Sequence, residues 1–309
     1  NVDQNDNFVV NGRNVDGNAL DGGYQEFTIS VNGSAPYMAN GVQFLNVYGY
    51  DLAGVDLTNP GINAKPDGGA GGIDTLDVRP YADNTPRGWG VHVNYNEGLP
   101  QGADGDQADL LIYRTSLYGG PVSEAIVAAP SAPDAGQLFS NNSSTNTPIV
   151  VIDYVGNTDM QILDDDGFTS DTDTLTLRGT NPDTPFASGN DTVVADFTKA
   201  GNAANPIVTV NDGGTILYRV QTIQNIRSLA IDTLGGNDFV AIFGQNNGGT
   251  VAIDDLNVNT GSGDDFLLLD NTNGLSSMSS GIKYDGGSGY DLLQFDGLTL
   301  IDQATYLVG

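Results

Sequence analysis

The sequence predicts an all-β chain that ends in a right-handed parallel β-helix, preceded by a β-rich part that is either sandwich-like or an irregular solenoid. Apolar runs of four to seven residues, rich in Val, Ile, Leu, Thr and Tyr, alternate with Gly, Asn, Asp and Pro. Lys, Glu, Met and Arg, which favour helices, are rare. Near the C-terminus an Asp recurs in a glycine-rich setting at a nearly constant step, which is typical of a repeating β-coil.

Strands are expected where the apolar runs lie. Several runs alternate apolar and polar residues, as residues 91–95 do, which predicts one buried and one wet face. The best helical candidate, 122–129, is short and is followed by Pro130. The expected strands are 8–10, 24–31, 42–48, 75–78, 90–95, 108–114, 149–154, 160–163, 174–177, 192–197, 207–210, 216–220, 226–231, 239–243, 251–258, 266–269, 282–284, 292–295 and 299–301.

A polar segment divides the chain. From 128 to 148 the sequence is rich in Ala, Pro, Ser and Asn, a composition typical of loops and linkers. We therefore expect an N-terminal β-rich domain over 1–136, a linker or long loop over 137–148, and a β-helical Gly/Asp-rich repeat domain over 149–309. A long loop inside one continuous coil is the alternative.

The strongest motif is the segment GGSGYDLLQ at 286–294, which fits the nonapeptide G-G-x-G-x-D-x-U-x at every specified position. Degenerate copies read GSGDDFLL at 261–268 and GGNDFV at 235–240. Their aligned aspartates, Asp238, Asp265 and Asp291, are 27 and 26 residues apart. A roll built only from such nonapeptides would repeat about every 18 residues. The larger step therefore predicts a parallel β-helix whose coils have several faces.

The residues of this corner suit calcium. Glycines permit a positive φ and a close approach of neighbouring coils. Asp supplies a hard oxygen ligand and exposed turn carbonyls supply more. Coils about 4.8 Å apart would stack one Asp per coil into a column of like charges, which needs either water or a divalent cation between coils. The alternative for each Asp is an Asx-turn at a strand end.

Composition limits the partners. The formal net charge is −29, from 39 acidic and 10 basic residues. Such a chain repels nucleic acid and anionic membranes, which excludes both as partners. Acidic surfaces are also common in secreted and halotolerant bacterial proteins. No cysteine is present, so disulfides and thiol chemistry are excluded. The chain has no run of about 18 apolar residues, so no membrane span is expected. The chain ends like an unfinished strand, and we expect a processed product or one module of something longer.

Residues 170–309 resemble the calcium-binding repeats of RTX proteins and, more broadly, the Gly/Asp-rich repeats of very large bacterial surface proteins of planctomycete type. The resemblance rests on the motifs above and on VTVNDG at 208–213, IRSLAID at 226–232 and LGGND at 234–238. RTX repeats are consecutive, whereas here one stands in each coil, which leaves room for coils joined by Asn and Asp side chains without metal. The resemblance implies Ca²⁺ as the cofactor. The ligands that it implies are Asp291 with the carbonyls of Gly287 and Gly289, and then Asp265, Asp264 and Asp238. A neighbouring corner would be lined by Asp254, Asp255, Asp232 and Asp285.

Enzymatic function is not expected. No nucleophile, zinc or phosphate-binding motif is present, and His92, the single histidine, lies in an alternating strand as a surface residue would. The 39 acidic residues would supply a pair of glycosidase-like carboxylates by accident. The alternative is a carbohydrate-active β-helix enzyme (a polysaccharide lyase or hydrolase) or a carbohydrate-binding module, in which Trp89, Tyr81 and Tyr95 would form a sugar-stacking platform.

These observations predict a structural protein of a bacterial cell surface. We expect a secreted, extracellular module of a surface layer, fibre or giant adhesin, stiffened by Ca²⁺. Its partners would be copies of itself or neighbouring modules, with cell-surface polysaccharide as a further candidate. Open ends of a stacked β-coil favour docking of the next module.

Overall fold

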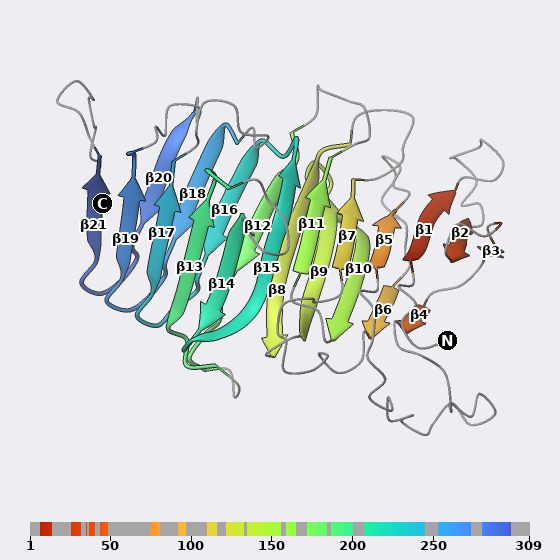
Figure 1. The fold of residues 1–309 in the computed structure, drawn as a ribbon, viewed down its shortest axis with the longest axis horizontal. Coiled ribbons are helices and arrows are strands. Elements are labelled where there is room, and N and C mark those ends of the chain that lie inside the picture. Colours follow the sequence, from red (N-terminus) through yellow and green to blue (C-terminus); the bar gives the residue numbers. More distant parts are fainter. Residues whose placement is uncertain are drawn as a thin grey trace.

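A computed structural model describes the chain over 7–13, 26–31, 35, 37–40, 44–48, 75–80, 92–96, 110–115, 122–132, 135–155, 159–164, 172–183, 187–199, 207–244, 253–272 and 280–297. Every regular element within these ranges is a β-strand (Figure 1). The all-β prediction is therefore confirmed. The expected strand 299–301 lies outside the described residues.

The strands form two mixed sheets, which we name sheet A and sheet B. Sheet A contains, in spatial order, β21 (Leu292–Asp296), β19 (Phe266–Asp270), β17 (Phe239–Phe243), β13 (Asp191–Asp196), β14 (Val208–Asp212), β15 (Thr215–Gln224), β11 (Asp159–Leu163), β7 (Leu110–Arg114), β5 (Thr75–Arg79), β1 (Asn7–Arg13), β2 (Glu26–Val31) and β3 (Tyr37–Asn40). Sheet B contains β20 (Gly281–Asp285), β18 (Asp255–Asn259), β16 (Ser228–Asp232), β12 (Thr174–Arg178), β8 (Glu124–Ala132), β9 (Ala135–Asn142), β10 (Thr147–Val155), β6 (His92–Asn96) and β4 (Phe44–Tyr48).

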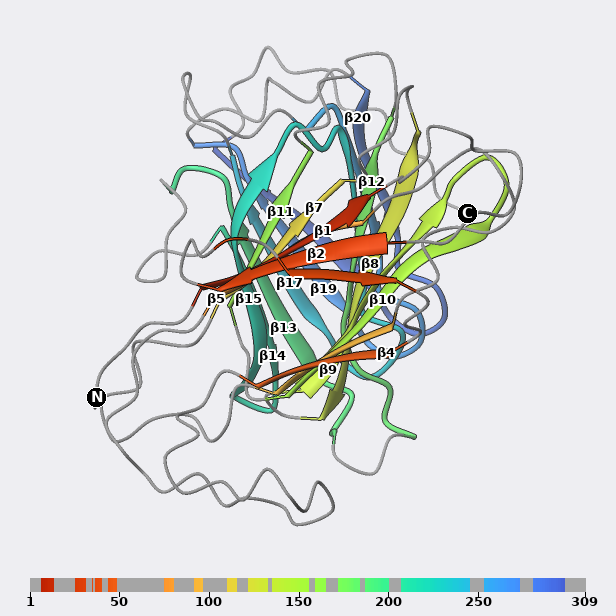
Figure 2. The same ribbon diagram turned by 90° about the vertical axis from the view of Figure 1, so that its right-hand side faces the viewer.

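The two sheets lie face to face, and the chain passes back and forth between them (Figures 1 and 2). From β15 onward, successive strands alternate between sheet A and sheet B. Each strand pairs in parallel with the strand one coil away, so that Leu229 is opposite Leu256 and Leu256 is opposite Ile282. In sheet A the same holds for Val240, Leu267 and Leu293. The register is therefore constant from coil to coil.

Antiparallel segments interrupt this alternation. The strands β8, β9 and β10 form a three-stranded meander in sheet B, and β13, β14 and β15 form a second one in sheet A. A third, β1 to β3, lies at the end of sheet A. In each of the first two, the outer strands of the meander pair in parallel with the strands of adjoining coils. The parallel stack thus continues on both sides of each meander.

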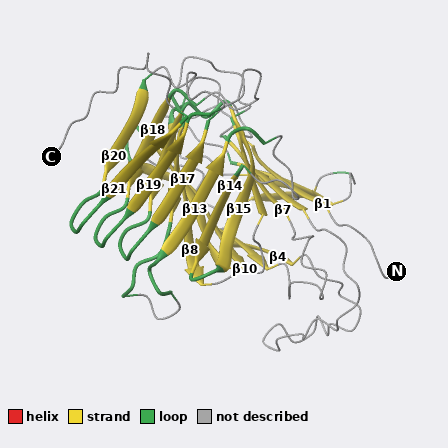
Figure 3. Cartoon of the chain, turned by 60° about the vertical axis from the view of Figure 1, so that its left-hand side comes forward, coloured by secondary structure: helices red, strands yellow, loops and turns green. Residues whose placement is uncertain are grey.

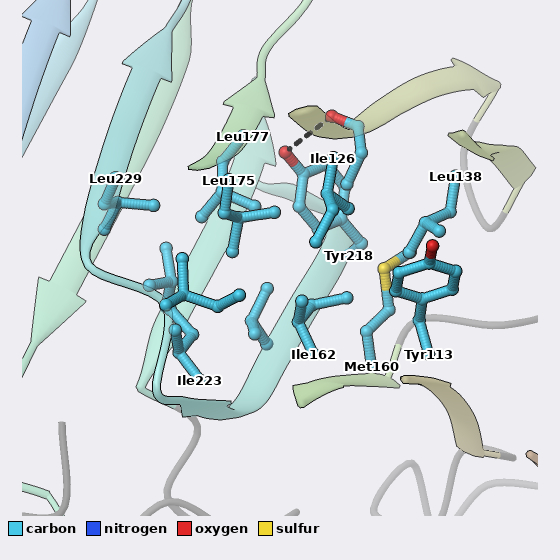
Figure 4. Close-up of a cluster of buried hydrophobic side chains, with 14 of the residues drawn as sticks. Tyr113, Ile126, Leu138, Met160, Ile162, Leu175, Leu177, Tyr218, Ile223 and Leu229 are labelled. Carbon is cyan, nitrogen blue, oxygen red and sulfur yellow. Dashed lines mark hydrogen bonds between the residues drawn. The ribbon is translucent and has the colours of Figure 1, made fainter. Parts of the chain in front are cut away.

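The core lies between the sheets and follows from the alternation of side chains along each strand. In β12 and β16 the inward-facing residues Leu175, Leu177, Leu229 and Ile231 are buried, while their neighbours are partly exposed. Figure 4 shows how such side chains from both sheets meet, and it includes the large ring of Tyr113. The remaining labelled residues of this cluster are Ile126, Leu138, Met160, Ile162, Tyr218 and Ile223.

The segment expected to be a linker is instead part of sheet B. Residues 137–148 belong to β9, to a tight turn and to β10, and these two strands pair along their length. The Oδ1 atom of Asn142 accepts hydrogen bonds from the backbone N–H of Ser144 and Thr145, and Asn146 has a φ of 54°. The polar composition therefore marks a hairpin turn. The best helical candidate, 122–129, also lies mostly in a strand, β8.

Candidate functional site

Four aspartates stack in one column at the corner where the chain enters sheet A. Asp191 begins β13, and Asp238, Asp265 and Asp291 directly precede β17, β19 and β21. Because those four strands are neighbours in register, the aspartates lie side by side from coil to coil. The short loops that carry the last three are stacked in the same way (Figure 3). The predicted alignment of Asp238, Asp265 and Asp291 is confirmed, and we name the four residues the aspartate column.

Three carboxylates of the aspartate column, those of Asp238, Asp265 and Asp291, each accept a backbone hydrogen bond from the preceding coil. The N–H of Asp191 donates to Oδ1 of Asp238 at 2.8 Å, and the N–H of Asp238 donates to Oδ1 of Asp265 at 2.8 Å. The N–H of Asp265 donates to Oδ1 of Asp291 at 3.3 Å. The side chains therefore satisfy backbone donors that no strand ladder reaches.

The residues just before these aspartates form a second ladder in the opposite direction. The N–H of Asn237 donates to Oδ1 of Asn190 at 2.7 Å, and the N–H of Asp264 donates to Oδ1 of Asn237 at 2.9 Å. The N–H of Tyr290 donates to Oδ1 of Asp264 at 2.9 Å. Here each side chain accepts from the following coil. We name Asn190, Asn237 and Asp264 the Asx column.

A glycine column allows the coils to approach this closely. Gly236, Gly263 and Gly289 have φ values of 126°, 137° and 138°. A Cβ on Gly263 would lie 1.6 Å from the carbonyl oxygen of Gly236, and one on Gly289 would lie 1.8 Å from that of Gly263. Both the backbone conformation and the space thus require glycine, as the sequence pattern predicted.

Threonine hydroxyls line the buried side of the aspartate column. Thr233 donates to Oδ2 of Asp238 at 2.5 Å, and Thr180 donates to Oδ1 of Asp191 at 3.1 Å through its hydroxyl. Thr233 also lies 3.3 Å from the carbonyl oxygen of Thr260. These threonines are almost completely buried. They supply hydrogen bonds where water is excluded.

Burial makes Asp191, Asp238 and Asp265 of the aspartate column hard to ionise. It raises the pKa of Asp191 to about 7, and the charge of Asp238 adds to this effect. It also raises the pKa of Asp238 to about 6, with a contribution from the charge of Asp265. The hydrogen bonds from Thr180 and Thr233 oppose these shifts. Burial likewise raises the pKa of Asp265, which is 2% exposed.

The second predicted calcium corner is not formed, because its members lie at opposite ends of the sheet B strands. Asp255 begins β18 and Asp254 precedes it, whereas Asp232 ends β16 and Asp285 ends β20. Five residues of strand separate the two ends by about 13 Å. Asp254 lies 3.2 Å from the guanidinium of Arg227.

The remaining members of this group have separate partners. Asp255 lies 3.2 Å from Nζ of Lys283, and Asp285 accepts a hydrogen bond from the N–H of Gly287 at 3.0 Å. In the described part of the chain, no three His, Cys, Asp or Glu side chains form a group that could hold a metal ion. Ca²⁺ therefore stays a prediction from the sequence.

The carbohydrate platform is not assembled from the described residues. The side chain of Tyr95 is 1% exposed and belongs to the core, so the expectation that its ring is available at the surface is corrected. Its strand, β6, directs that side chain inward between outward-facing neighbours. Trp89 and Tyr81 lie outside the described residues. The imidazole of His92 is partly exposed, and its Nε2 lies 2.6 Å from Oδ2 of Asp153 on the neighbouring strand β10.

Sequence reasoning missed part of this corner. Asp191 and Asn190 belong to the two columns although they lie 47 residues before Asp238 and Asn237. The meander β13 to β15 accounts for the longer interval. The signal was present in the sequence, because Ser188-Gly189-Asn190-Asp191 matches Gly235-Gly236-Asn237-Asp238 in its last three residues.

One position of the corner departs from the glycine pattern. Leu234 has a φ of 71° and stacks on Gly261 and Gly287, whose φ values are 85° and 77°. We expect Leu234→Gly to raise the free energy of unfolding by about 0.5–1 kcal/mol, because a left-handed conformation costs an L-residue about 1–2 kcal/mol and glycine's extra chain entropy offsets part of that gain. Urea unfolding measures this change. Leu234→Ala is the control, and equal effects of the two variants would contradict the explanation.

A scan against protein-family models, a search of curated proteins and a search of solved structures each gave no match. Among the described residues there is no helix of the length and apolar character needed to cross a membrane.

Proposed function

We propose that the chain is a structural, non-enzymatic module of a secreted bacterial cell-surface assembly, such as a surface layer, a fibre or a giant adhesin. The observation that carries the proposal is the constant register of the stacked strands. The strands β16, β18 and β20 repeat in one sheet and β17, β19 and β21 in the other, without a shift. A regular stack of this kind suits a scaffold.

The same registers support a finer description of the C-terminal part as a parallel β-helix. Its coils run from β16 to β21, and the corner residues of neighbouring coils hydrogen-bond at steps of 27 and 26 residues. In repeat proteins of this type each coil contacts only its neighbours, and stability is a sum of such contacts. Backbone hydrogen bonds run along the axis of the stack, so force applied along that axis is transmitted from coil to coil through these bonds.

The C-terminal end of the stack supports association with a further module. The inward-facing side chains of β20 and β21 pack against the core but stay partly exposed, unlike their equivalents in earlier coils. Leu292 is 49% exposed and Tyr290 is 76% exposed. Exposed apolar residues beside an edge strand are typical of surfaces that dock another strand. The partner is a second copy or a neighbouring module.

The acidic composition agrees with an extracellular location. A formal net charge of −29 opposes association with nucleic acid and favours solubility in a saline medium. The absence of cysteine leaves cohesion to the strands and the corner residues.

Electron microscopy and sedimentation of the full chain test the proposal. We expect elongated assemblies whose size increases with protein concentration, because end-to-end contacts that do not close into a ring keep adding copies. Labelled antibodies should also place the chain on the native cell surface. The proposal would be contradicted by dispersed monomers at every concentration together with an absence of the chain from the cell surface.

A matched pair of variants tests the end contact. Leu292 on β21 and Val155 on β10 are 49% and 51% exposed. We expect Leu292→Lys to reduce the sedimenting assemblies at least about tenfold, because a buried, unpaired lysine in an interface is strongly unfavourable. Val155→Lys introduces the same charge in the middle of sheet B and should leave assembly unchanged. Equal effects of the two substitutions would rule out this end as the interface.

A further inference from the structure

We propose that the aspartate column and the Asx column are hydrogen-bonded ladders that join neighbouring coils without a bound cation. In this role the aspartates act as acceptors of backbone N–H groups, and the Ca²⁺ that the sequence predicts at this corner is not required. The inference concerns cohesion of the coils and is independent of what the assembled protein does.

Backbone donors already point at the oxygens of the aspartate column. The backbone N–H groups of Asp191 and Asp238 point at Oδ1 atoms of the next carboxylates, each at 2.8 Å. A calcium ion needs six to eight oxygen ligands around it at about 2.3–2.6 Å. The positive end of an N–H dipole already occupies the approach to these oxygens. An ion placed there would face the donors and repel them.

The turn carbonyls are occupied in the same way. The carbonyl oxygen of Ser262 accepts the N–H of Gly236 at 2.7 Å, and that of Ser288 accepts the N–H of Gly263 at 2.8 Å. The carbonyl oxygen of Gly261 accepts the N–H of Ser288 at 2.9 Å. These three turn carbonyls therefore already accept a hydrogen bond between coils, and a calcium ion would compete with the donors for them.

The chemistry of the Asx column gives a third, independent argument. Its positions hold Asn190, Asn237 and Asp264, and the next coil has Tyr290 there. Asparagine and aspartate can both accept an N–H through Oδ1. A calcium site gains from carboxylate charge and is weakened where Asn or Tyr replaces Asp. The residue types thus fit hydrogen bonding better than metal binding.

Asp265 is the position where the two interpretations differ most. Its Oδ1 accepts the N–H of Asp238, while its buried Oδ2 makes no hydrogen bond of good geometry, although the nearby Thr260 side chain lowers the pKa of this carboxyl. That Oδ2 is the atom through which the column would bind a cation. Asp265→Asn keeps the acceptor oxygen and removes the charge, whereas Asp265→Ala removes both. Asp183→Asn makes the same charge change at an exposed residue and is the control.

Thermal unfolding of the full chain and of these variants, each in EGTA and in excess CaCl₂, tests the proposal. We expect the same wild-type midpoint in both media, and an Asp265→Asn midpoint no lower than it, because the neutral side chain keeps the acceptor oxygen and avoids the burial cost that raises the pKa of Asp265. Asp265→Ala should lower the midpoint by about 2–8 °C, because the N–H of Asp238 loses its acceptor in a buried site. Hydrogen exchange at that N–H should be slow in wild type and in Asp265→Asn, and fast in Asp265→Ala.

Two results would overturn the inference. One is a calcium-induced rise of the wild-type midpoint by more than about 5 °C that Asp265→Asn abolishes and Asp183→Asn retains. The other is a loss of stability in EGTA that is as large for Asp265→Asn as for Asp265→Ala. The first would identify Asp265 as a calcium ligand, and the second would show that its acceptor oxygen contributes nothing.

Discussion

Replacement of Gly263 by alanine is expected to lower the free energy of unfolding by more than about 4 kcal/mol, the largest effect of any single substitution considered for this corner. Gly263 has a φ of 137°, which costs an L-residue about 1–3 kcal/mol. In addition, the new Cβ would lie 1.6 Å from the carbonyl oxygen of Gly236. That atom belongs to the backbone of the adjoining coil, so the coils must separate. Urea unfolding followed by circular dichroism measures the loss.

Gly281→Ala separates the two causes. Gly281 also has a positive φ, 88°, but an added Cβ would meet no atom within 4 Å. We therefore expect this variant to lose only about 1–2 kcal/mol, from the conformational term alone. If the two substitutions proved equally harmful, close stacking at the glycine column would not be the reason for its composition.

Acidification is expected to stabilise the aspartate column, which is the reverse of the usual behaviour of carboxylates. The pKa of Asp238 is raised from 3.8 to about 6 in the folded state, mainly by burial. The folded protein therefore binds this proton more tightly than the unfolded chain does. The resulting stability is complete below about pH 4 and is lost as the pH rises through about 6. The Asp191 carboxyl, with a pKa of about 7, extends the loss to higher pH.

Asp238→Asn should remove this dependence. A shift from 3.8 to about 6 corresponds to about 3 kcal/mol, so the variant should gain about that much relative to wild type between about pH 4 and pH 8. The Oδ1 acceptor for Asp191 is kept. Thr233 can donate to the carbonyl oxygen of Thr260 when its partner at 238 is an amide. Urea unfolding at several pH values gives the measurement, and parallel pH profiles for the two proteins would contradict the pKa shift.

The sequence predicts the strands and the aspartate alignment because both depend on local patterns. Short apolar runs bounded by Gly and Asp predict β17 and β19, and the glycines at 263 and 289 permit the close stacking of neighbouring corners. A constant step then brings Asp238, Asp265 and Asp291 together, whatever the rest of the chain does.

The meanders could not be predicted in this way. A strand that returns antiparallel in the same sheet has the same alternation as one that crosses to the other sheet. The residues around Asn142 and Asn146 are polar in a hairpin turn and equally polar in a linker, so composition alone does not distinguish them. The distinction depends on pairing with β8 and β10, which are distant contacts.

The chemistry of the corner was also ambiguous in the sequence. An Asp carboxylate is a good ligand for Ca²⁺ and a good acceptor for N–H, and the residue type does not reveal which it does. The direction of the Asp238 N–H toward Asp265 is a property of coil spacing. The spacing of one repeat per coil left room for coils joined by Asn and Asp side chains without metal, and Asn237 does accept such a hydrogen bond from Asp264.

The first two meanders have a consequence for how this chain can change its length. In sheet B, β8 and β9 lie between β12 and β10, and in sheet A, β14 and β15 lie between β13 and β11. Beyond these two insertions, β10 and β11 continue the alternation of successive strands between the sheets. Each insertion adds two strands, so the two insertions lengthen sheet A and sheet B equally, by about 9.6 Å each. If only one insertion were lost, one sheet would be two strands shorter than the other, and every later coil would be tilted. In this region an insertion or deletion of strands in one sheet must therefore be matched by an equal change in the other sheet.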